Sequence, residues 1–198
     1  MERMERQFAF ALEADKEKNI IRHTLVSDGS RRENDAEHAW HAALMAVLLS
    51  EYANEKIDVL RTVTMLLIHD MVEIDAGDTY AYDEQANLNR REREEKAADR
   101  VFGILPGDQR GKLRALWEEF EACETPEAKF AHTMDNIQPA MLNNATNGQA
   151  WVEHSVRLSQ ILKRNQTTPE GSQSLWDYAL GHIFLPNVKK GNIIDDAN

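Results

Sequence analysis

The stretch "MLLIHDMVEIDAGD", residues 65–78, joins an apolar run to one histidine and four acids. Its first half predicts a helix that packs in the core, and its second half places His69, Asp70 and Glu73 within one helical turn. An ionised carboxylate that is buried without a partner is costly, so such groups are normally paired or bound to a metal. The stretch therefore predicts a helix that delivers polar side chains to a bound cation.

Helical periodicity extends over most of the chain. Apolar residues recur three or four positions apart, and no alternating pattern typical of strands is present. We therefore predict an all-α fold, a helical bundle in a single domain, residues 1–198, with a core of about 20–165 and C-terminal helices within 151–190 packed on it. The expected helices are 5–18, 37–53, 58–74, 88–103, 108–122, 126–146, 151–165 and 172–190. Asp58 and Thr125 are expected N-caps, while Gly77 and Gly148 are expected to end helices.

Two further segments are interpreted from their composition. The charged segment 87–105 is interpreted as a solvated helix face with salt bridges. Six aromatic and methionine side chains at helical spacing are interpreted as core residues: Trp40, Met65, Trp117, Met134, Trp151 and Trp176.

Composition restricts the compartment and the partners. Cys123 is the only cysteine, which excludes an internal disulfide and favours a reducing compartment. The N-terminus lacks the apolar core of a signal peptide, and no run approaches the roughly 20 apolar residues of a membrane span, so we expect a cytoplasmic protein without a membrane partner. The net charge of −11 and the lack of a basic cluster disfavour a nucleic-acid polymer as partner. A small anionic ligand would need positive charge from a metal or a few arginines.

A second candidate histidine lies in "RRENDAEHAWHAALMAVLL", residues 31–49. His38 stands where polar residues give way to an apolar helix, after a polar segment that includes Glu33 and Glu37. His41 lies one turn later among apolar residues and competes for the same role. We favour His38 as the ligand and interpret His41 as a core histidine or one that supports the ligands.

A third contributor is Asp135, in "EAKFAHTMDNIQPAMLN", residues 127–143. It stands in the middle of a helix among apolar residues, an expensive position for a carboxylate without a strong partner. Pro139 cannot donate a backbone hydrogen bond to the carbonyl of Asp135, so a local kink can help present this side chain. The alternative is that Asp135 faces water from the wet side of the helix.

Together these motifs resemble the HD-domain superfamily of metal-dependent phosphohydrolases, over residues of about 20–165. "RRENDAEHAWH", "LLIHDMVEIDAGD" and "FAHTMDNI" are most similar to the branch of the bacterial 5′-deoxynucleotidases. The resemblance implies a homodimer and one divalent cation held by His38, His69, Asp70 and Asp135. Nitrogen and oxygen ligands of this kind suit Mn²⁺, Co²⁺, Fe²⁺, Ni²⁺ or Zn²⁺.

The resemblance also implies two acids that act in catalysis. These fall on Glu73, expected to orient water, and Asp78, expected to transfer protons. That branch carries an Arg-Trp pair that contacts substrate, whereas the nearest candidate here is Arg22 followed by His23, with slightly altered spacing.

Two arginines are candidates to bind a phosphate by paired hydrogen bonds, namely Arg22 and Arg31. For Arg31 the alternative is a salt bridge to Glu33 or Glu37.

The expected function is hydrolysis of the phosphate monoester of a small metabolite, with a deoxynucleoside 5′-monophosphate as the leading substrate. One alternative is a phosphatase or pyrophosphohydrolase that acts on another nucleotide. The other is a non-catalytic interaction module that binds a metal, which the presence of both Glu73 and Asp78 argues against.

Overall fold

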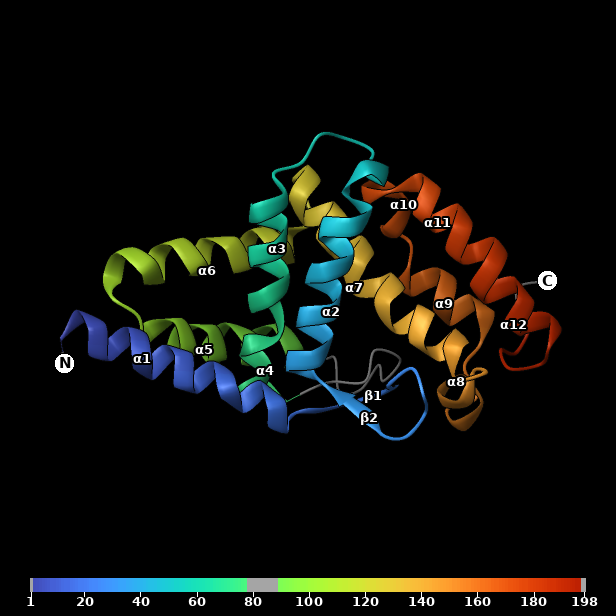
Figure 1. Ribbon diagram of the computed structural model, residues 1–198, viewed down its shortest axis with the longest axis horizontal. Coiled ribbons are helices and arrows are strands. Elements are labelled where there is room, and N and C mark those ends of the chain that lie inside the picture. The colour runs from blue at the N-terminus through green and yellow to red at the C-terminus, as the bar shows by residue number, and fades with distance from the viewer. Residues whose placement is uncertain (1, 78–88, 197–198) are drawn as a thin grey trace.

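Helices make up most of the structure, a computed structural model that describes residues 2–77 and 89–196 (Figure 1). The α-helices are α1 Arg3–Ala14, α2 Asp35–Leu49, α3 Val59–Ile68, α4 Glu73–Ala76, α5 Arg90–Gly103, α6 Gly107–Ala122, α7 Pro126–Ala145, α8 Gln149–Glu153, α9 Leu158–Arg164, α10 Thr168–Gly171, α11 Gln173–Ala179 and α12 Leu185–Lys189. They are joined by the 3₁₀ turns η1 (Asp15–Asn19), η2 (Ser50–Tyr52) and η3 (His69–Val72) and by the π-helical turn η5 (Leu180–Phe184). The prediction of an all-α fold is confirmed.

The central element is α7, the longest helix among the described residues at 20 residues. Figure 1 shows α7 crossing the middle of the molecule, with α5 and α6 on one side and α8 to α12 on the other. It packs against α2, α3, α6 and α10. As expected, the Thr125 side chain caps it by accepting a hydrogen bond from the Ala128 N–H at 3.2 Å, and Pro126 occupies the first helical position. A well-anchored α7 therefore gives Asp135 a fixed place.

A small antiparallel sheet was not predicted. Strands β1 (Ile21–Leu25) and β2 (Arg32–Asn34) pair between η1 and α2. They are too short, and too polar at Arg22 and Glu33, to show the alternating pattern of a strand. A two-stranded hairpin is marginal alone, and this one is stabilised by packing on α7 and α8.

Two of the expected helices are interrupted. The expected helix 58–74 consists of α3, the 3₁₀ turn η3 and α4, with Asp58 capping α3 and Gly77 ending α4 at a positive φ of 76°. The expected helix 151–165 is split into α8 and α9, with Ser155 at φ 50° between them. Gly148, at φ 72°, separates α7 from α8 as expected. The first break is the one that matters, because η3 carries His69 and Asp70.

Most of the expected core residues are buried. Met65, Trp117 and Met134 are fully enclosed, and Trp151 is nearly so, while Trp176 is partly buried. The prediction for Trp40 is wrong, since 62% of its surface is exposed. Helix α2 is apolar on nearly all sides, so periodicity does not indicate which side faces inward.

The contact between α10 and α7 depends on a glycine. A Cβ atom at Gly171 would overlap the Lys129 carbonyl oxygen and the Thr133 hydroxyl of α7. Thr133 Oγ1 donates to the Thr168 carbonyl of α10 at 3.0 Å, a bond that needs this close approach.

No helix in residues 2–77 and 89–196 has the length and apolar character needed to span a membrane.

Candidate metal centre

Four side chains from three elements meet in the interior. His38 comes from α2, His69 and Asp70 from η3, and Asp135 from α7. His38 Nε2 lies 3.0 Å from Asp135 Oδ1 and 3.9 Å from Asp70 Oδ2. His69 Nε2 lies 3.2 Å from Asp70 Oδ2 and 3.7 Å from Asp135 Oδ1. The structure therefore brings together all four residues that the sequence resemblance assigns to the metal.

Local structure explains why these side chains converge. Asn34 caps α2 by accepting the Glu37 N–H at 3.0 Å, which starts the helix just before His38. At the end of α3 the backbone tightens into η3, so that His69 and Asp70 are delivered side by side. The side chain of Asp135 is only 14% exposed, which excludes the alternative that it faces water.

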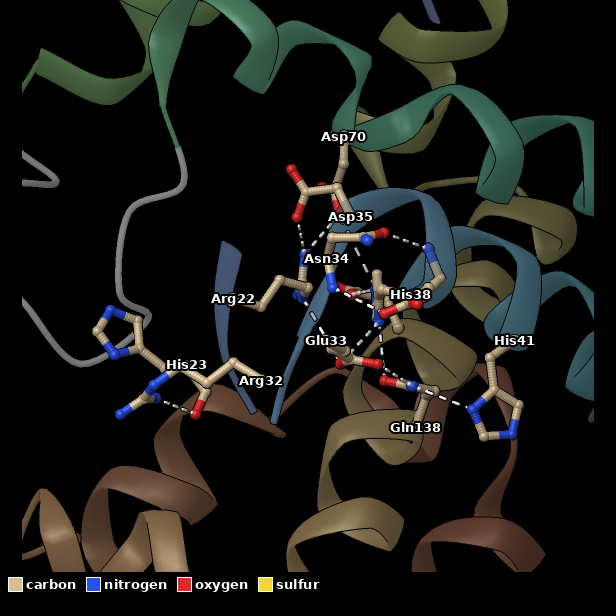
Figure 2. Close-up of polar contacts among 12 residues, drawn as sticks. Arg22, His23, Arg32, Glu33, Asn34, Asp35, His38, His41, Asp70 and Gln138 are labelled. Atoms are coloured by element: carbon tan, nitrogen blue, oxygen red, sulfur yellow. Dashed lines mark hydrogen bonds and ion pairs between the residues drawn. The ribbon is translucent and has the colours of Figure 1, made fainter. Parts of the chain in front are cut away.

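The tautomer of His38 follows from Gln138. The Gln138 Nε2 donates to Glu33 Oε2 at 3.0 Å and lies 3.1 Å from His41 Nδ1 (Figure 2). Its Oε1 is therefore the atom that lies 2.8 Å from His38 Nδ1, and a carbonyl oxygen only accepts. His38 thus carries its proton on Nδ1. In the neutral ring, Nε2 turns a lone pair toward Asp135.

The same argument applies to His69. Its Nδ1 donates to the Leu66 carbonyl at 2.8 Å, so the lone pair of the neutral ring is on Nε2. This buried Nε2 forms no hydrogen bond within the described residues. The Nε2 lone pairs of the two neutral histidines therefore face the carboxylates of Asp70 and Asp135. They repel these carboxylates unless the rings take up a second proton or a metal ion lies between them. One ligand atom each of His38, His69 and Asp135 lie within 4.8 Å of one another. Together with Asp70 Oδ2, which lies 3.9 and 3.2 Å from the two Nε2 atoms, this donor set fits a divalent transition metal.

Charges within the cluster shift its pKa values. Burial lowers the pKa of His69, but the negative charges of Asp70 and Asp135 outweigh it and hold this pKa well above its ordinary value. Burial raises the pKa of Asp70 and Asp135, but contacts with the histidines, and with Arg22 for Asp70, outweigh it and leave both below their ordinary value. Both carboxylates are therefore ionised at neutral pH, as metal ligands must be.

Arg22 lies beside the cluster and is largely engaged with acids. Its Nη1 donates to Asp70 Oδ2 at 2.7 Å and to Asp35 Oδ1 at 3.1 Å, and its Nε lies 3.8 Å from Glu33 Oε1. Burial lowers its pKa, but these and nearby acids outweigh burial and raise it well above the ordinary value. Figure 2 shows Arg22 extending from β1 toward Asp35 and Asp70. Arg22 therefore holds Asp70 through Oδ2, the same oxygen that lies near the two histidines.

Two candidates from the sequence do not reach the cluster directly. Arg31 is exposed and donates to both carboxylate oxygens of Glu37 at 2.8 and 2.6 Å, outside the cavity described below. The salt-bridge alternative for Arg31 is thus the one observed, because Glu37 is its near neighbour at the start of α2. His41 reaches His38 only through Gln138, and burial lowers its pKa.

The two expected catalytic acids have different positions. Glu73 is buried at the start of α4, and one oxygen each of Asp35, Asp70 and Glu73 lie within 4.8 Å of one another. Asp78 lies outside the described residues. Beneath this group, Glu17 of η1 is 6% exposed, and burial followed by the charge of Asp70 raises its pKa to about 8. The surroundings of Asp70 are therefore strongly acidic.

A cavity of about 510 Å³ opens beside the cluster and contains residues that the sequence reasoning missed. His69, Asp70, Glu73 and Asp135 line it. Its missed charged residues are Arg90, Arg91, Glu94, Glu121 and Arg164, and its missed uncharged residues include Phe120, Asn143, Trp151 and Phe184. The interpretation of segment 87–105 as a solvated face is wrong at Glu94, which is 4% exposed and accepts from Arg90 Nε at 2.5 Å. Glu94 lies three, four and seven positions before Ala97, Ala98 and Val101, a helical spacing that marks the buried face of α5 and that could have found it.

Two arginines of the cavity lie beside the metal cluster: Arg22, which is bonded to Asp70 and Asp35, and Arg164. Arg164 Nη2 lies 3.9 Å from Asp135 Oδ2, and 29% of its side chain is exposed. Arg90 and Arg91, by contrast, are bonded to Glu94 and to Glu95 and Glu121, respectively. Arg164 therefore presents a cation to the cavity next to the cluster.

Comparison with known proteins finds a family model that covers most of the chain. A family model described as HD domain matches residues 14–176. Human 5′-deoxynucleotidase HDDC2 is 32% identical over 108 residues, which are 54% of this chain and 52% of that protein. The Danio rerio protein of the same name is 28% identical over 106 residues, 54% of this chain and 52% of that protein. The chain thus spans about half the length of the curated relatives it matches.

Solved structures give a fuller match. The crystal structure of a predicted metal-dependent phosphohydrolase from Magnetospirillum magnetotacticum MS-1 is 47% identical, with a TM-score of 0.91, over 96% of this chain and 95% of that chain. A conserved hypothetical protein from Pyrococcus furiosus, 22% identical with a TM-score of 0.60 over 92% of this chain and 99% of that chain, shares the fold.

Proposed function

Because this chain belongs to the HD-domain family of metal-dependent phosphohydrolases, we propose that it cleaves the phosphate monoester of a small metabolite, with a deoxynucleoside 5′-monophosphate as the leading substrate. The observation that carries the proposal is a cavity of about 510 Å³ with the His–Asp cluster in its wall. That volume is in the range of small-molecule sites. The name 5′-deoxynucleotidase of the human relative supports the choice of substrate.

His38, His69, Asp70 and Asp135 are the proposed ligands of one divalent ion. Their nitrogens and oxygens suit Mn²⁺, Co²⁺, Fe²⁺, Ni²⁺ or Zn²⁺. When bound, such an ion would polarise a phosphoryl oxygen and lower the pKa of a bound water toward roughly 7. Gln138 and the Leu66 carbonyl fix the two imidazoles by accepting their Nδ1 protons, which leaves both Nε2 atoms as donors to the ion.

The remaining polar residues of the site act on the substrate and on protons. Arg164 is proposed to bind the phosphate, because its guanidinium faces the cavity beside Asp135. Glu73, buried beside Asp70, is proposed to orient the attacking water, and Asp78 to transfer a proton to the leaving oxygen. Arg22 supports the site by holding Asp70 and Asp35.

Polymeric nucleic acid is an unsuitable substrate for this surface. The chain carries a net charge of −11, and binding to a polymer depends mainly on many Lys and Arg contacts with phosphates. A single phosphate needs only local positive charge, which the ion and Arg164 supply within the cavity. The cytoplasmic location and the homodimer stay predictions, to be checked by cell fractionation and by light scattering after gel filtration.

Metal-free protein is the right starting material for a test of this function. Each of Mn²⁺, Co²⁺, Ni²⁺, Zn²⁺ and Fe²⁺ is added in turn, and phosphate release is measured from deoxynucleoside and ribonucleoside 5′-monophosphates, nucleoside triphosphates and sugar phosphates. Release from the monophosphates that depends on metal and is lost in His69→Ala supports the proposal. Arg31→Ala is the control, since Arg31 lies outside the cavity. If no ion restores release from any phosphate monoester, the proposed function is wrong.

A further inference from the structure

One face of α7 forms a wall of the cavity and leads away from the metal cluster. Asp135, Pro139 and Asn143 follow each other at intervals of four residues, and all three line the cavity. With a rise of 1.5 Å per residue, Asn143 stands about 12 Å along the helix from Asp135. That length is comparable to a nucleoside monophosphate from its phosphate to the far edge of its base.

The two sides of the cavity differ in the number of charged residues, since among the described lining residues the side of α8 to α12 contributes one, Arg164 beside the cluster. On the side of α5 and α6 the cavity is lined by ion-paired residues, among them Arg91 and Glu121. Toward α8 and η5, on the other side of α7 in Figure 1, it is lined by Trp151 and Phe184, whose ring centroids lie 5.9 Å apart at 50°. A planar, uncharged heterocycle packs favourably against aromatic rings and loses water poorly beside ion pairs. The α8 side therefore suits a base.

Asn143 is the polar residue that stands out at this end. It is 8% exposed, and its Oδ1 is buried without a hydrogen-bond partner among the described residues. The other buried amides of α7 are paired: Gln138 with His38 and Glu33, and Asn136 with Thr168 Oγ1 at 3.2 Å. A buried acceptor without a partner lowers the stability of the fold. A ligand group that donates a hydrogen bond to it would offset this cost, which explains why an asparagine stands at this position.

We propose that Asn143, Trp151 and Phe184 form the base subsite of the enzyme, with the Asn143 carboxamide hydrogen-bonded to the polar edge of a nucleobase. The inference rests on the proposed function, because it places the phosphate at the metal cluster and Arg164. A carboxamide offers an acceptor and two donors, which matches the adjacent N–H and carbonyl or ring-nitrogen groups of base edges. The subsite thus distinguishes a nucleotide from a sugar phosphate.

The test replaces Asn143 by the isosteric but apolar leucine. Asn143→Leu removes an unpaired buried acceptor, so the ligand-free variant should melt at the same temperature as wild type or above it. If Asn143 served only to stabilise the fold, Asn143→Leu would instead melt at a lower temperature than wild type. The matched control is Gln149→Leu, which removes an exposed carboxamide at the start of α8 that does not line the cavity. Asn143→Ala is the second variant, should leucine prevent folding.

Binding is measured by calorimetry for deoxyadenosine 5′-monophosphate and for deoxyribose 5-phosphate, which lacks the base. All proteins in this titration are loaded with Mn²⁺ and also carry Asp78→Asn, so that hydrolysis is slow during the measurement. Wild type and Gln149→Leu should bind the nucleotide more tightly than the sugar phosphate. In the Asn143 variants the ratio of the two affinities should fall about tenfold or more, as for the loss of a buried hydrogen bond. The ratio of the two kcat/KM values should fall in parallel.

The outcomes separate the two proposals. If the Asn143 variants keep the wild-type ratio of affinities, the proposal of the base subsite is wrong, even if the protein releases phosphate from nucleotides as proposed. If wild type binds the nucleotide but cleaves neither compound with any metal, the proposed function is wrong and the ratio of affinities still decides the subsite. If wild type binds the nucleotide no better than the sugar phosphate, the base subsite is wrong as well.

Discussion

The guanidinium Nη2 of Arg164 lies 3.9 Å from Oδ2 of Asp135, so the end of α9 brings a cation to the edge of the metal cluster. Arg164→Ala should lower kcat/KM for a phosphate monoester by about 10- to 100-fold, the loss expected for charge-assisted hydrogen bonds. Metal content should stay near that of wild type. Kinetics and elemental analysis on the same preparations measure both. Arg31→Ala is the matched control, and an Arg164→Ala variant with normal kcat/KM would contradict the role in phosphate binding.

Asp135→Ala should lower metal content, because it removes one of the four proposed ligands. Activity should be partly restored by excess Mn²⁺. Asp78→Asn, by contrast, should leave metal content nearly unchanged while turnover falls by about 10²- to 10⁴-fold, as for the loss of a general acid or base. Elemental analysis against rate in the two variants, each with a cooperative melt, makes the comparison. The assignment fails if Asp78→Asn loses the metal while Asp135→Ala keeps both metal and activity.

Gln138→Leu should weaken metal binding by about 10- to 100-fold, because the His38 Nδ1–H loses the acceptor that fixes its orientation. The variant should also melt at a lower temperature, since Glu33 loses the donor at 3.0 Å. Competition with a metal-sensitive dye gives the affinity. His41→Asn is the control, because His41 contacts the cluster only through Gln138. Equal affinities in Gln138→Leu and wild type would show that the amide does not orient His38 for the metal.

Stability of the metal-free protein should fall as pH rises from about 4.5 to 8, in part because of Glu17. Burial and the charge of Asp70 raise the pKa of Glu17 to about 8 in the folded protein, against 4.5 in the unfolded chain. Within that window the folded state binds more protons, so the free energy of unfolding decreases with pH. Glu17→Gln imitates the protonated acid and should remove this part of the decrease.

Thermal melts of metal-free wild type and Glu17→Gln at pH 5 and pH 8 provide the measurement. The variant should have the higher melting temperature at pH 8, by about 2–4 °C for each kcal/mol gained, and a smaller advantage at pH 5. The exposed acid Glu51, replaced by glutamine, is the control. A difference between variant and wild type that is the same at both pH values would rule out a raised pKa for Glu17.

The sequence located the cluster because each of its residues stands in a recognisable local context. His38 follows a capped helix start, His69 and Asp70 end an apolar run, and Asp135 lies within an apolar helix. Those contexts are local, so periodicity and motif spacing detect them. The all-α fold follows from the same kind of signal.

Sequence patterns could not predict contacts between residues that lie far apart in the chain. Gln138 meets His38 across 100 positions, and Arg164 reaches Asp135 from a separate helix. Glu94 was missed for another reason: its charge hid its place on the apolar face of α5, three and four positions before Ala97 and Ala98. The prediction for Trp40 is wrong because α2 is apolar on nearly all sides, so that only its packing against α3 and α7 decides which side is buried.

Gly171 has a consequence for how sequence variation in this protein should be interpreted. The residue touches neither the metal cluster nor the cavity, yet any side chain there would push α10 away from α7. Helix α10 follows directly on the segment that holds Arg164 and Asn165 against the cavity. A saturation screen scored on activity should therefore find Gly171 among the least tolerant positions, and its variants would be mistaken for defects of an active-site residue. Scoring the same library for abundance would separate the two classes, because a variant at Gly171 loses folded protein along with activity.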